Sequence, residues 1–77
     1  MSDAGFVVVR SDDGRFMDST GCWRREYPEA NVFPSLSDAR MSVRKTFRGT
    51  AAIFHTDGYA VEDGPRCVMD KGRVIFK

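Results

Sequence analysis

The sequence FPSLSDARMSVRKTFRG, residues 33–49, carries the strongest structural signal in this chain, and it predicts an amphipathic helix. Ser35 can cap the first turn through its hydroxyl, and Asp38 three residues later completes a variant of the capping box. Gly49 permits the left-handed turn with which many helices end. At about 100° per residue, one helix face collects the apolar side chains of Leu36, Ala39, Val43 and Phe47. We therefore expect one helix over about residues 35–48, against which the rest of the chain packs.

Short runs of β-branched and aromatic residues on both sides of this helix predict strands joined by tight turns. Asp-Gly and Lys-Gly pairs separate most of these runs, and such pairs are typical of β-hairpins. The expected strands cover residues 5–10, 15–18, 50–55, 59–62, 66–70 and 73–76. Their order is β-β-α-β-β, with a further β-β pair at the end. The sequence thus predicts an α+β fold, in which a small antiparallel sheet of 4 to 6 strands carries the helix on one face.

Length and composition predict a single small domain over residues 1–77, in which we expect residues 1–4 to be disordered. The apolar share of 42% is typical of a globular protein. No run of about 18 apolar residues is present, which argues against a transmembrane helix. The first residues also lack the pattern of a signal peptide, in which a basic stretch is followed by an apolar one. We therefore expect a cytoplasmic protein.

Residues 22–34 predict an ordered loop, because Pro28 is incompatible with a long helix. We expect this loop to lay Trp23 over the edge of the core. The two cysteines, Cys22 and Cys67, are distant in sequence, and cytoplasmic thiols are usually reduced, so we expect no disulfide. A zinc site needs about four ligands, and only His55 could join the two thiols. We therefore expect no metal and no cofactor.

The predicted sheet has two apolar faces, although one helix can cover only one of them. Alternation along the strands assigns one set of apolar side chains to each face. The first set is Val7, Val9, Met17, Ala52, Phe54 and Ile75, and the second is Phe6, Val8, Phe16, Ile53, Val74 and Phe76. An uncovered apolar face of that size is unusual for a monomer. The second face is covered by residues 22–34, by the last hairpin, or by another chain in a homodimer or complex.

Five short motifs resemble those of a set of short uncharacterised bacterial and phage proteins. They are Val8-Val9-Arg10, Gly14-Arg15-Phe16, Gly21-x-Trp23, Ala30-x-Val32-Phe33 and Ser35-x-x-x-Ala39. In those proteins a strand, a Gly-Arg-aromatic turn, a Gly-x-Trp and an Ala-x-x-Phe lead into one helix. The resemblance covers roughly residues 6–45 and implies a small strand-hairpin-helix module. It implies no activity and no catalytic residues.

The residues that could perform catalysis form no recognisable arrangement in the sequence. His55, the only histidine, falls at the end of a predicted strand, where a structural role is more common. Cys22 would need a neighbouring base to act as a nucleophile, and the spacing supplies none. The pair Asp12-Asp13 is typical of a turn, and with Asp18 it matches no calcium-binding loop. We therefore expect a protein that is not an enzyme and has no small-molecule substrate.

A protein-binding role is the leading functional hypothesis. Aromatic residues and arginine are enriched at the energetically important positions of interfaces. The candidate interface residues are Trp23, Tyr27, Val7, Val9, Phe54 and Ile75. The alternative for Trp23 is ordinary packing in the core. The expected partner is another protein or a second copy of this chain.

Nucleic-acid binding is the second hypothesis. Residues 35–49 hold four basic side chains and one acid, for a charge of +3, whereas the whole chain carries only +1. Arginines spaced four apart form a row along one flank of the helix, where they could contact phosphates. The candidate residues are Arg40, Arg44, Lys45 and Arg48, with Arg24 and Arg25 from the preceding loop. The alternative is a solvated flank, whose arginine stems shield apolar surface.

Overall fold

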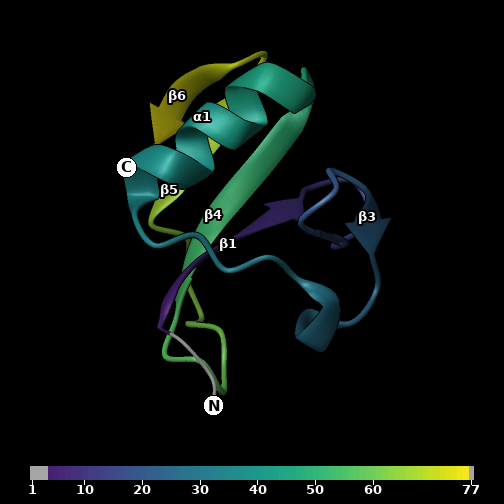
Figure 1. Cartoon of the computed structure of the whole chain (residues 1–77). Coiled ribbons are helices and arrows are strands. Elements are labelled where there is room, and N and C mark those ends of the chain that lie inside the picture. Colours follow the sequence, from purple (N-terminus) through teal and green to yellow (C-terminus); the bar gives the residue numbers. More distant parts are fainter. Residues whose placement is uncertain (1–3, 77) are drawn as a thin grey trace.

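The computed structural model describes residues 4–76 (Figure 1). In chain order its elements are β1 (Gly5–Arg10), β2 (Phe16–Met17), β3 (Trp23–Arg24), the 3₁₀ helix η1 (Tyr27–Glu29), α1 (Leu36–Thr46), β4 (Thr50–Thr56), β5 (Cys67–Asp70) and β6 (Arg73–Phe76). Of the segment expected to be disordered, residues 1–3 lie outside the described part. Ala4 is exposed and belongs to no helix or strand.

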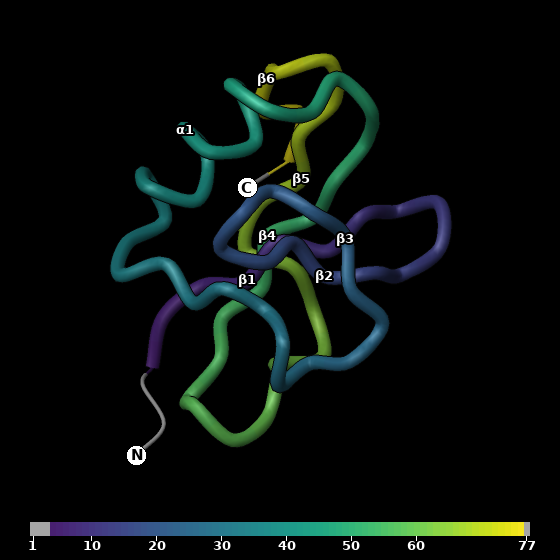
Figure 2. Tube along the Cα trace, turned by 45° about the vertical axis from the view of Figure 1, so that its right-hand side comes forward, coloured from purple at the N-terminus to yellow at the C-terminus, as the bar shows by residue number. Residues whose placement is uncertain are grey.

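The predicted α+β fold is confirmed. Six strands form one antiparallel sheet in the order β3-β2-β1-β4-β5-β6, and α1 packs across one face against β1 and β4 (Figure 1). The hairpin of β5 and β6 brings the end of the chain back beside the helix (Figure 2). No helix within residues 4–76 has the length and apolar character needed to cross a membrane.

The helix forms for the local reasons that its sequence suggests. The Ser35 hydroxyl accepts a hydrogen bond of 3.1 Å from the backbone N–H of Asp38, which satisfies one of the donors left open in a first helical turn. Ala39 and Val43 are fully buried. The helix ends at Thr46, earlier than expected, because Phe47 adopts an extended backbone and packs its ring 5.0 Å from that of Trp23.

The core lies between α1 and the middle of the sheet. Val8 and Ile53 face each other on the central strand pair, and both have no exposed surface. The other fully buried or nearly fully buried members of this cluster are Met17, Ala39, Val43, Ala51, Cys67 and Met69. Burial of one such large apolar side chain contributes about 1.5–3 kcal/mol, so this cluster supplies most of the driving force for folding.

Two segments differ from their predicted structure. Residues 59–62 form no strand, and only Val61 bridges to Thr56. The Asp57 carboxylate accepts hydrogen bonds from the backbone N–H groups of Tyr59 and Ala60, so the chain turns back locally before it can pair further. Residues 22–34, expected as a loop, contain β3 and η1, with Pro28 in the first turn of η1, a position where its missing N–H costs nothing.

The strand registers also correct the predicted composition of the two faces. Phe16 lies opposite Val9 on the face away from the helix, whereas Met17 lies in the core beneath the helix. At the other side of the sheet, the register shifts between Val68 and Met69, so that Ile75 has no partner and Phe76 lies opposite Val68. This bulge transfers Phe76 to the face away from the helix, because one extra residue reverses the alternation of side chains.

Candidate interaction surfaces

An apolar row crosses five strands on the face of the sheet opposite α1. The registers place Val9 opposite both Phe16 and Ala52, Ala52 opposite Val68, and Val68 opposite Phe76. Side chains that are paired in this way point to the same face. None of the five is buried, and Phe76 at the end of the row is 55% exposed. We call these five residues the apolar row.

Part of this face is covered from within the chain by Tyr27 in η1. The Tyr27 ring packs edge to face against Phe16, with 5.9 Å between ring centroids, and its hydroxyl reaches Thr56. Beneath this cover Val7 is fully buried, so it has no surface to offer a partner. The loop thus covers the half of the face nearest β2, as the intramolecular alternative expected. Tyr27 also reaches the last residue of β4, but the remaining half of the face keeps exposed surface at Ala52 in β4, Val68 in β5 and Phe76 in β6.

The uncovered half ends at β6, which pairs with β5 on one side only within the described residues. Ile75, the residue at the bulge, is 61% exposed. An edge strand has unpaired backbone N–H and C=O groups, and a bulge limits uncontrolled pairing at such an edge. β6 is therefore an apolar edge whose backbone is still available for pairing.

One border of the apolar row holds an acid and a base. The Thr50 hydroxyl donates a 2.8 Å hydrogen bond to Asp70, which lies opposite the exposed Arg73. The hydrogen-bonded pair of Arg66 and Glu62 lies elsewhere, because a carboxylate oxygen of Glu62 is 3.2 Å from His55, which points to the helix side of the sheet. The border with Asp70 and Arg73 places polar groups next to an apolar centre, which is the general arrangement of protein interfaces.

The other predicted interface residues lie in different places. Trp23 is half-buried against the core on the helix side, where the guanidinium of Arg10 lies 5.1 Å from its ring centroid. Phe54 is half-buried on the face away from α1, opposite the buried Val7. The structure brings Val9, Phe54 and Tyr27 to one face but places Trp23 on the other.

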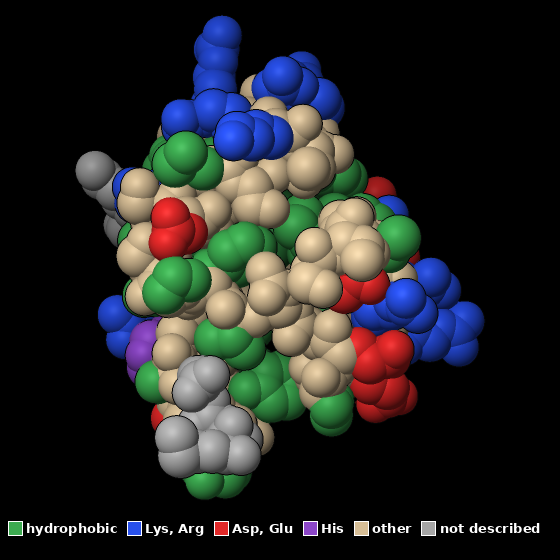
Figure 3. All heavy atoms as spheres, in the orientation of Figure 1, with side chains coloured by type: hydrophobic (Ala, Val, Ile, Leu, Met, Phe, Trp, Pro, Cys, Tyr) green, Lys and Arg blue, Asp and Glu red, His purple; other side chains and the backbone are tan. Residues whose placement is uncertain are grey.

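The predicted basic row does not form one surface. Arg24 donates a 2.8 Å hydrogen bond to Asp18 and lies 3.8 Å from Glu29. Arg25 is exposed in the segment between β3 and η1, before the helix. Arg40 is half-buried, and its Nε has no hydrogen-bond partner within residues 4–76. Only Arg44, Lys45 and Arg48 remain together and exposed, near the C-terminal end of α1, where basic side chains gather in Figure 3.

Sequence reasoning missed two basic residues that share this end. Lys71 and Arg73 flank Gly72 in the turn between β5 and β6, and the Nε of Arg44 donates a 3.2 Å hydrogen bond to the carbonyl of Gly72. A β-carbon on Gly72 would lie 2.6 Å from Nη1 of Arg48, so this arginine lies directly over the turn. The Lys-Gly pair predicts the turn, but nothing in the sequence predicts its place beside α1.

Acidic residues elsewhere are held in their charged form. Hydrogen bonds from the Thr20 side chain and from Arg24 keep the pKa of Asp18 well below its ordinary value. A hydrogen bond from the Arg10 side chain lowers the pKa of Asp13 to about 2. Both carboxylates therefore stay ionised at neutral pH and stabilise the turns around β2.

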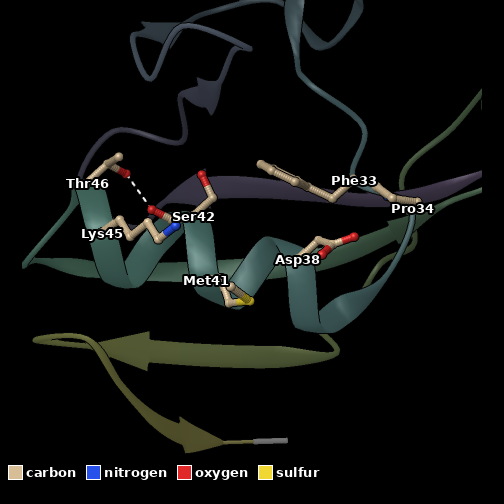
Figure 4. Close-up of a pocket in the computed structure, with 7 residues that line it drawn as sticks. All are labelled: Phe33, Pro34, Asp38, Met41, Ser42, Lys45 and Thr46. Carbon is tan, nitrogen blue, oxygen red and sulfur yellow. Dashed lines mark hydrogen bonds between the residues drawn. The ribbon is translucent and has the colours of Figure 1, made fainter.

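Two surface hollows contain polar groups. One of ≈ 400 Å³ runs along the flank of α1 and is lined by Phe33, Pro34, Asp38, Met41, Ser42, Lys45 and Thr46 (Figure 4). Its lining holds one acidic residue, Asp38, and one basic residue, Lys45. The other lining residues are apolar or carry a hydroxyl group. A smaller one of ≈ 270 Å³ holds His55, whose Nδ1 lies 3.2 Å from a carboxylate oxygen of Glu62. Within residues 4–76, no three side chains of His, Cys, Asp and Glu are grouped as metal ligands.

The chain thus belongs to the class of small α+β domains in which one helix covers one face of an antiparallel sheet. No family model, curated protein or solved structure that we compared with the chain matches it. The resemblance to short bacterial and phage proteins and the expectation that the chain is not an enzyme both stay predictions.

Proposed function

We propose that this protein is a non-catalytic interaction module that associates with a second copy of itself through the sheet face opposite α1. The observation that carries this proposal is the apolar row, which spans five strands and ends in the exposed Phe76. When a partner removes the remaining apolar surface of these side chains from water, the free energy of the complex is lowered. Both cysteines are free, which is compatible with the cytoplasmic location that we propose.

The border of the row with Asp70 and Arg73 favours a second copy over an unrelated partner. A two-fold axis parallel to the strands and between β5 and β6 would bring Asp70 of one copy against Arg73 of the other. The same axis would bring Val68 of one copy against Phe76 of the other. The surface is therefore complementary to itself in charge as well as in its apolar centre.

The size of the face is also adequate for a dimer. The molecule measures 33 × 23 × 19 Å. One broad face therefore has a footprint of roughly 750 Å², close to the about 800 Å² per partner that a standard interface buries. Because Tyr27 already covers part of this face, we expect association at the weak end of that range.

The test is the mass of the protein in solution over a wide concentration range, with the variant Phe76→Asp. We expect the mass to rise toward that of a dimer for the natural chain and to stay monomeric for the variant, since a carboxylate would be desolvated at the interface. Met41→Asp is the matched control, because Met41 is 47% exposed but lies on α1, away from the apolar row. It should associate like the natural chain.

A natural chain that stays monomeric at the highest concentration would contradict self-association and leave the face to a different protein. Equal loss of association in both variants would likewise count against the apolar row as the interface. Because the side chains of Phe76 and Met41 are both about half exposed and lie outside the core, neither change is expected to unfold the monomer.

A further inference from the structure

The end of the molecule where α1 stops carries five exposed basic side chains from two separate parts of the chain. They are Arg44, Lys45, Arg48, Lys71 and Arg73. Arg44 and Lys45 lie in α1, and Arg48 follows it. Lys71 and Arg73 flank Gly72 between β5 and β6. Figures 1 and 2 show the turn beside the end of α1, and contacts of Arg44 and Arg48 with Gly72 fix this arrangement. We call these five residues the basic end.

The basic end differs in its lack of acidic partners from Arg10, Arg15, Arg24 and Arg66, whereas Arg25 and Arg40 also form no ion pair within residues 4–76. Arg10 and Arg15 pair with Asp13, while the ion pairs of Arg24 and Arg66 are described above. None of the five residues of the basic end forms an ion pair within residues 4–76. The nearest acid along the strands, Asp70, lies opposite Arg73 in the β5–β6 pair and accepts a hydrogen bond from Thr50, but it forms no ion pair with Arg73. A chain with a net charge of only +1 therefore concentrates positive charge at one end.

The helix dipole explains only part of this concentration. Basic residues near a helix C-terminus interact favourably with its partial negative charge, which accounts for Arg44, Lys45 and Arg48. It does not account for basic residues in a β-turn. Mutual repulsion among five such charges is unfavourable unless an anion binds between them.

The conformation of Lys71 gives a second, independent observation. Its φ is +54°, and Gly72 follows with +77°, as in the two-residue turns that favour Asn-Gly or Gly-Gly. Left-handed backbone is unfavourable for a lysine, so asparagine or glycine would form this turn at lower cost. A lysine at this position places its charge at the tip of the turn, although its backbone conformation is less favourable there than that of asparagine or glycine.

We propose that the basic end binds the phosphodiester backbone of duplex nucleic acid. This surface is not the helix flank that the sequence predicts. It includes Lys71 and Arg73, and it leaves out Arg24, Arg25 and Arg40. It contains no residue of the apolar row and shares only Arg73 with the border of that row. A duplex offers closely spaced phosphates, to which clustered arginines and lysines bind without reading the bases.

A duplex fits better than a single strand because the turn has no aromatic platform for unstacked bases. Of the two exposed aromatic side chains, Tyr59 is 78% exposed in the loop after β4. Phe76 lies at the other end of β6 from the turn, about 10 Å away at the rise of a strand. Contacts at the basic end are therefore expected to reach phosphates only.

The experiment is a titration of the folded protein with duplex DNA of mixed sequence at several salt concentrations. Between 50 and 200 mM salt, affinity should fall roughly 40-fold if three phosphates are contacted and roughly 500-fold if five are contacted. A single-stranded DNA of the same length should bind more weakly, with a shallower salt dependence.

The variant Lys71→Gln with Arg73→Gln removes two charges from the turn and should reduce the slope of log affinity against log salt by about 1.8. Lys45→Gln, on the exposed surface of α1, should reduce it by about 0.9 and does not involve the turn. Arg25→Gln is the matched control, because Arg25 is exposed and has no ion pair within the described residues. It should bind duplex DNA like the natural chain.

Absence of duplex binding at low salt would overturn the proposal, and so would an equal loss of binding in Arg25→Gln. Tighter binding to single strands would contradict the choice of a duplex backbone. Poly-glutamate serves as a protein-like polyanion. If it binds with the same salt dependence while duplex DNA does not, the basic end takes an acidic protein and the proposal fails.

Discussion

The hydroxyl oxygens of Tyr27 and Thr56 lie 2.6 Å apart and connect η1 to the end of β4 across 29 residues of sequence. The Thr56 hydroxyl donates to the carbonyl of Ala60 at 2.8 Å and accepts from the N–H of Gly58 at 3.1 Å. Its one proton is therefore used, and Tyr27 must be the donor. A fully buried hydroxyl thus makes all three of the hydrogen bonds that it can form.

Tyr27→Phe removes this hydrogen bond while leaving the ring against Phe16. We expect a loss of about 1 kcal/mol in the free energy of unfolding, which is typical of one buried hydrogen bond. Urea denaturation followed by circular dichroism measures it. Tyr59→Phe is the control, because Tyr59 is 78% exposed and should show no change. Equal stability of Tyr27→Phe and the natural chain would contradict the role of this bond.

Ser35→Ala removes the cap of α1. The free energy of unfolding should fall by about 1 kcal/mol, because the N–H of Asp38 loses its 3.1 Å acceptor. Ser37→Ala, an exposed position in the first turn of the same helix, should leave stability nearly unchanged. An equal loss of stability in both variants would contradict the role of the cap, because alanine has a higher helix propensity than serine and Ser37 makes no capping bond.

Gly72→Ala tests the contact between the last hairpin and the helix end. Gly72 has a φ of +77°, and an added β-carbon would lie 2.6 Å from Nη1 of Arg48. We expect a loss of about 1–2 kcal/mol from the left-handed backbone alone. Gly64→Ala is the control, since no atom lies within 4 Å of its added β-carbon, and it should be neutral or slightly stabilising. Thermal unfolding of both variants distinguishes them.

Stability should decrease in acid because of Asp13 and Asp18. Their pKa values are lower in the folded state than the ordinary 3.8, so their contribution to stability is fully present above about pH 5. It is lost as the pH falls toward the folded pKa of Asp13, about 2, and Asp18 continues the loss below that.

Denaturation with urea at a series of pH values measures this effect. The free energy of unfolding should change little between pH 7 and pH 5 through these groups and fall between about pH 4 and pH 2. Asp18→Asn should be less stable at neutral pH, because Arg24 loses its charged partner, and should show a smaller decrease in acid. A free energy of unfolding that rises on acidification would contradict this prediction.

The two cysteines should react at very different rates. Cys22 is exposed, whereas Cys67 has no exposed surface beneath α1. A thiol reagent should therefore modify one cysteine in the native protein and the second only after denaturant is added. Mass spectrometry of the labelled protein identifies the site. Rapid modification of Cys67 under native conditions would mean that the core opens more readily than its packing suggests.

Features that depend on neighbouring residues alone are those that sequence reasoning predicted well. The helix was expected over residues 35–48 and spans Leu36–Thr46, because capping by Ser35 and the apolar stripe are local properties. The final hairpin around Lys71 and Gly72 formed as expected for the same reason. The strand expected at residues 59–62 does not form. A strand needs a neighbouring strand to pair with, and the hydrogen bonds to Asp57 turn the chain away from such pairing.

The surfaces, in contrast, depend on how distant segments meet. Alternation along single strands placed Phe76 with Val8, but the unpaired Ile75 reverses its direction, and only the pairing of β6 with β5 reveals that. Likewise, charge along the helix suggested a basic flank, while Lys71 and Arg73 join it through the tertiary contact of Gly72 with Arg44. Periodicity and capping act over a few residues and can be read from the amino-acid order. Strand register, and the proximity of basic residues from α1 and from the β5–β6 turn, result from packing of the whole chain. They can be seen only in the folded structure.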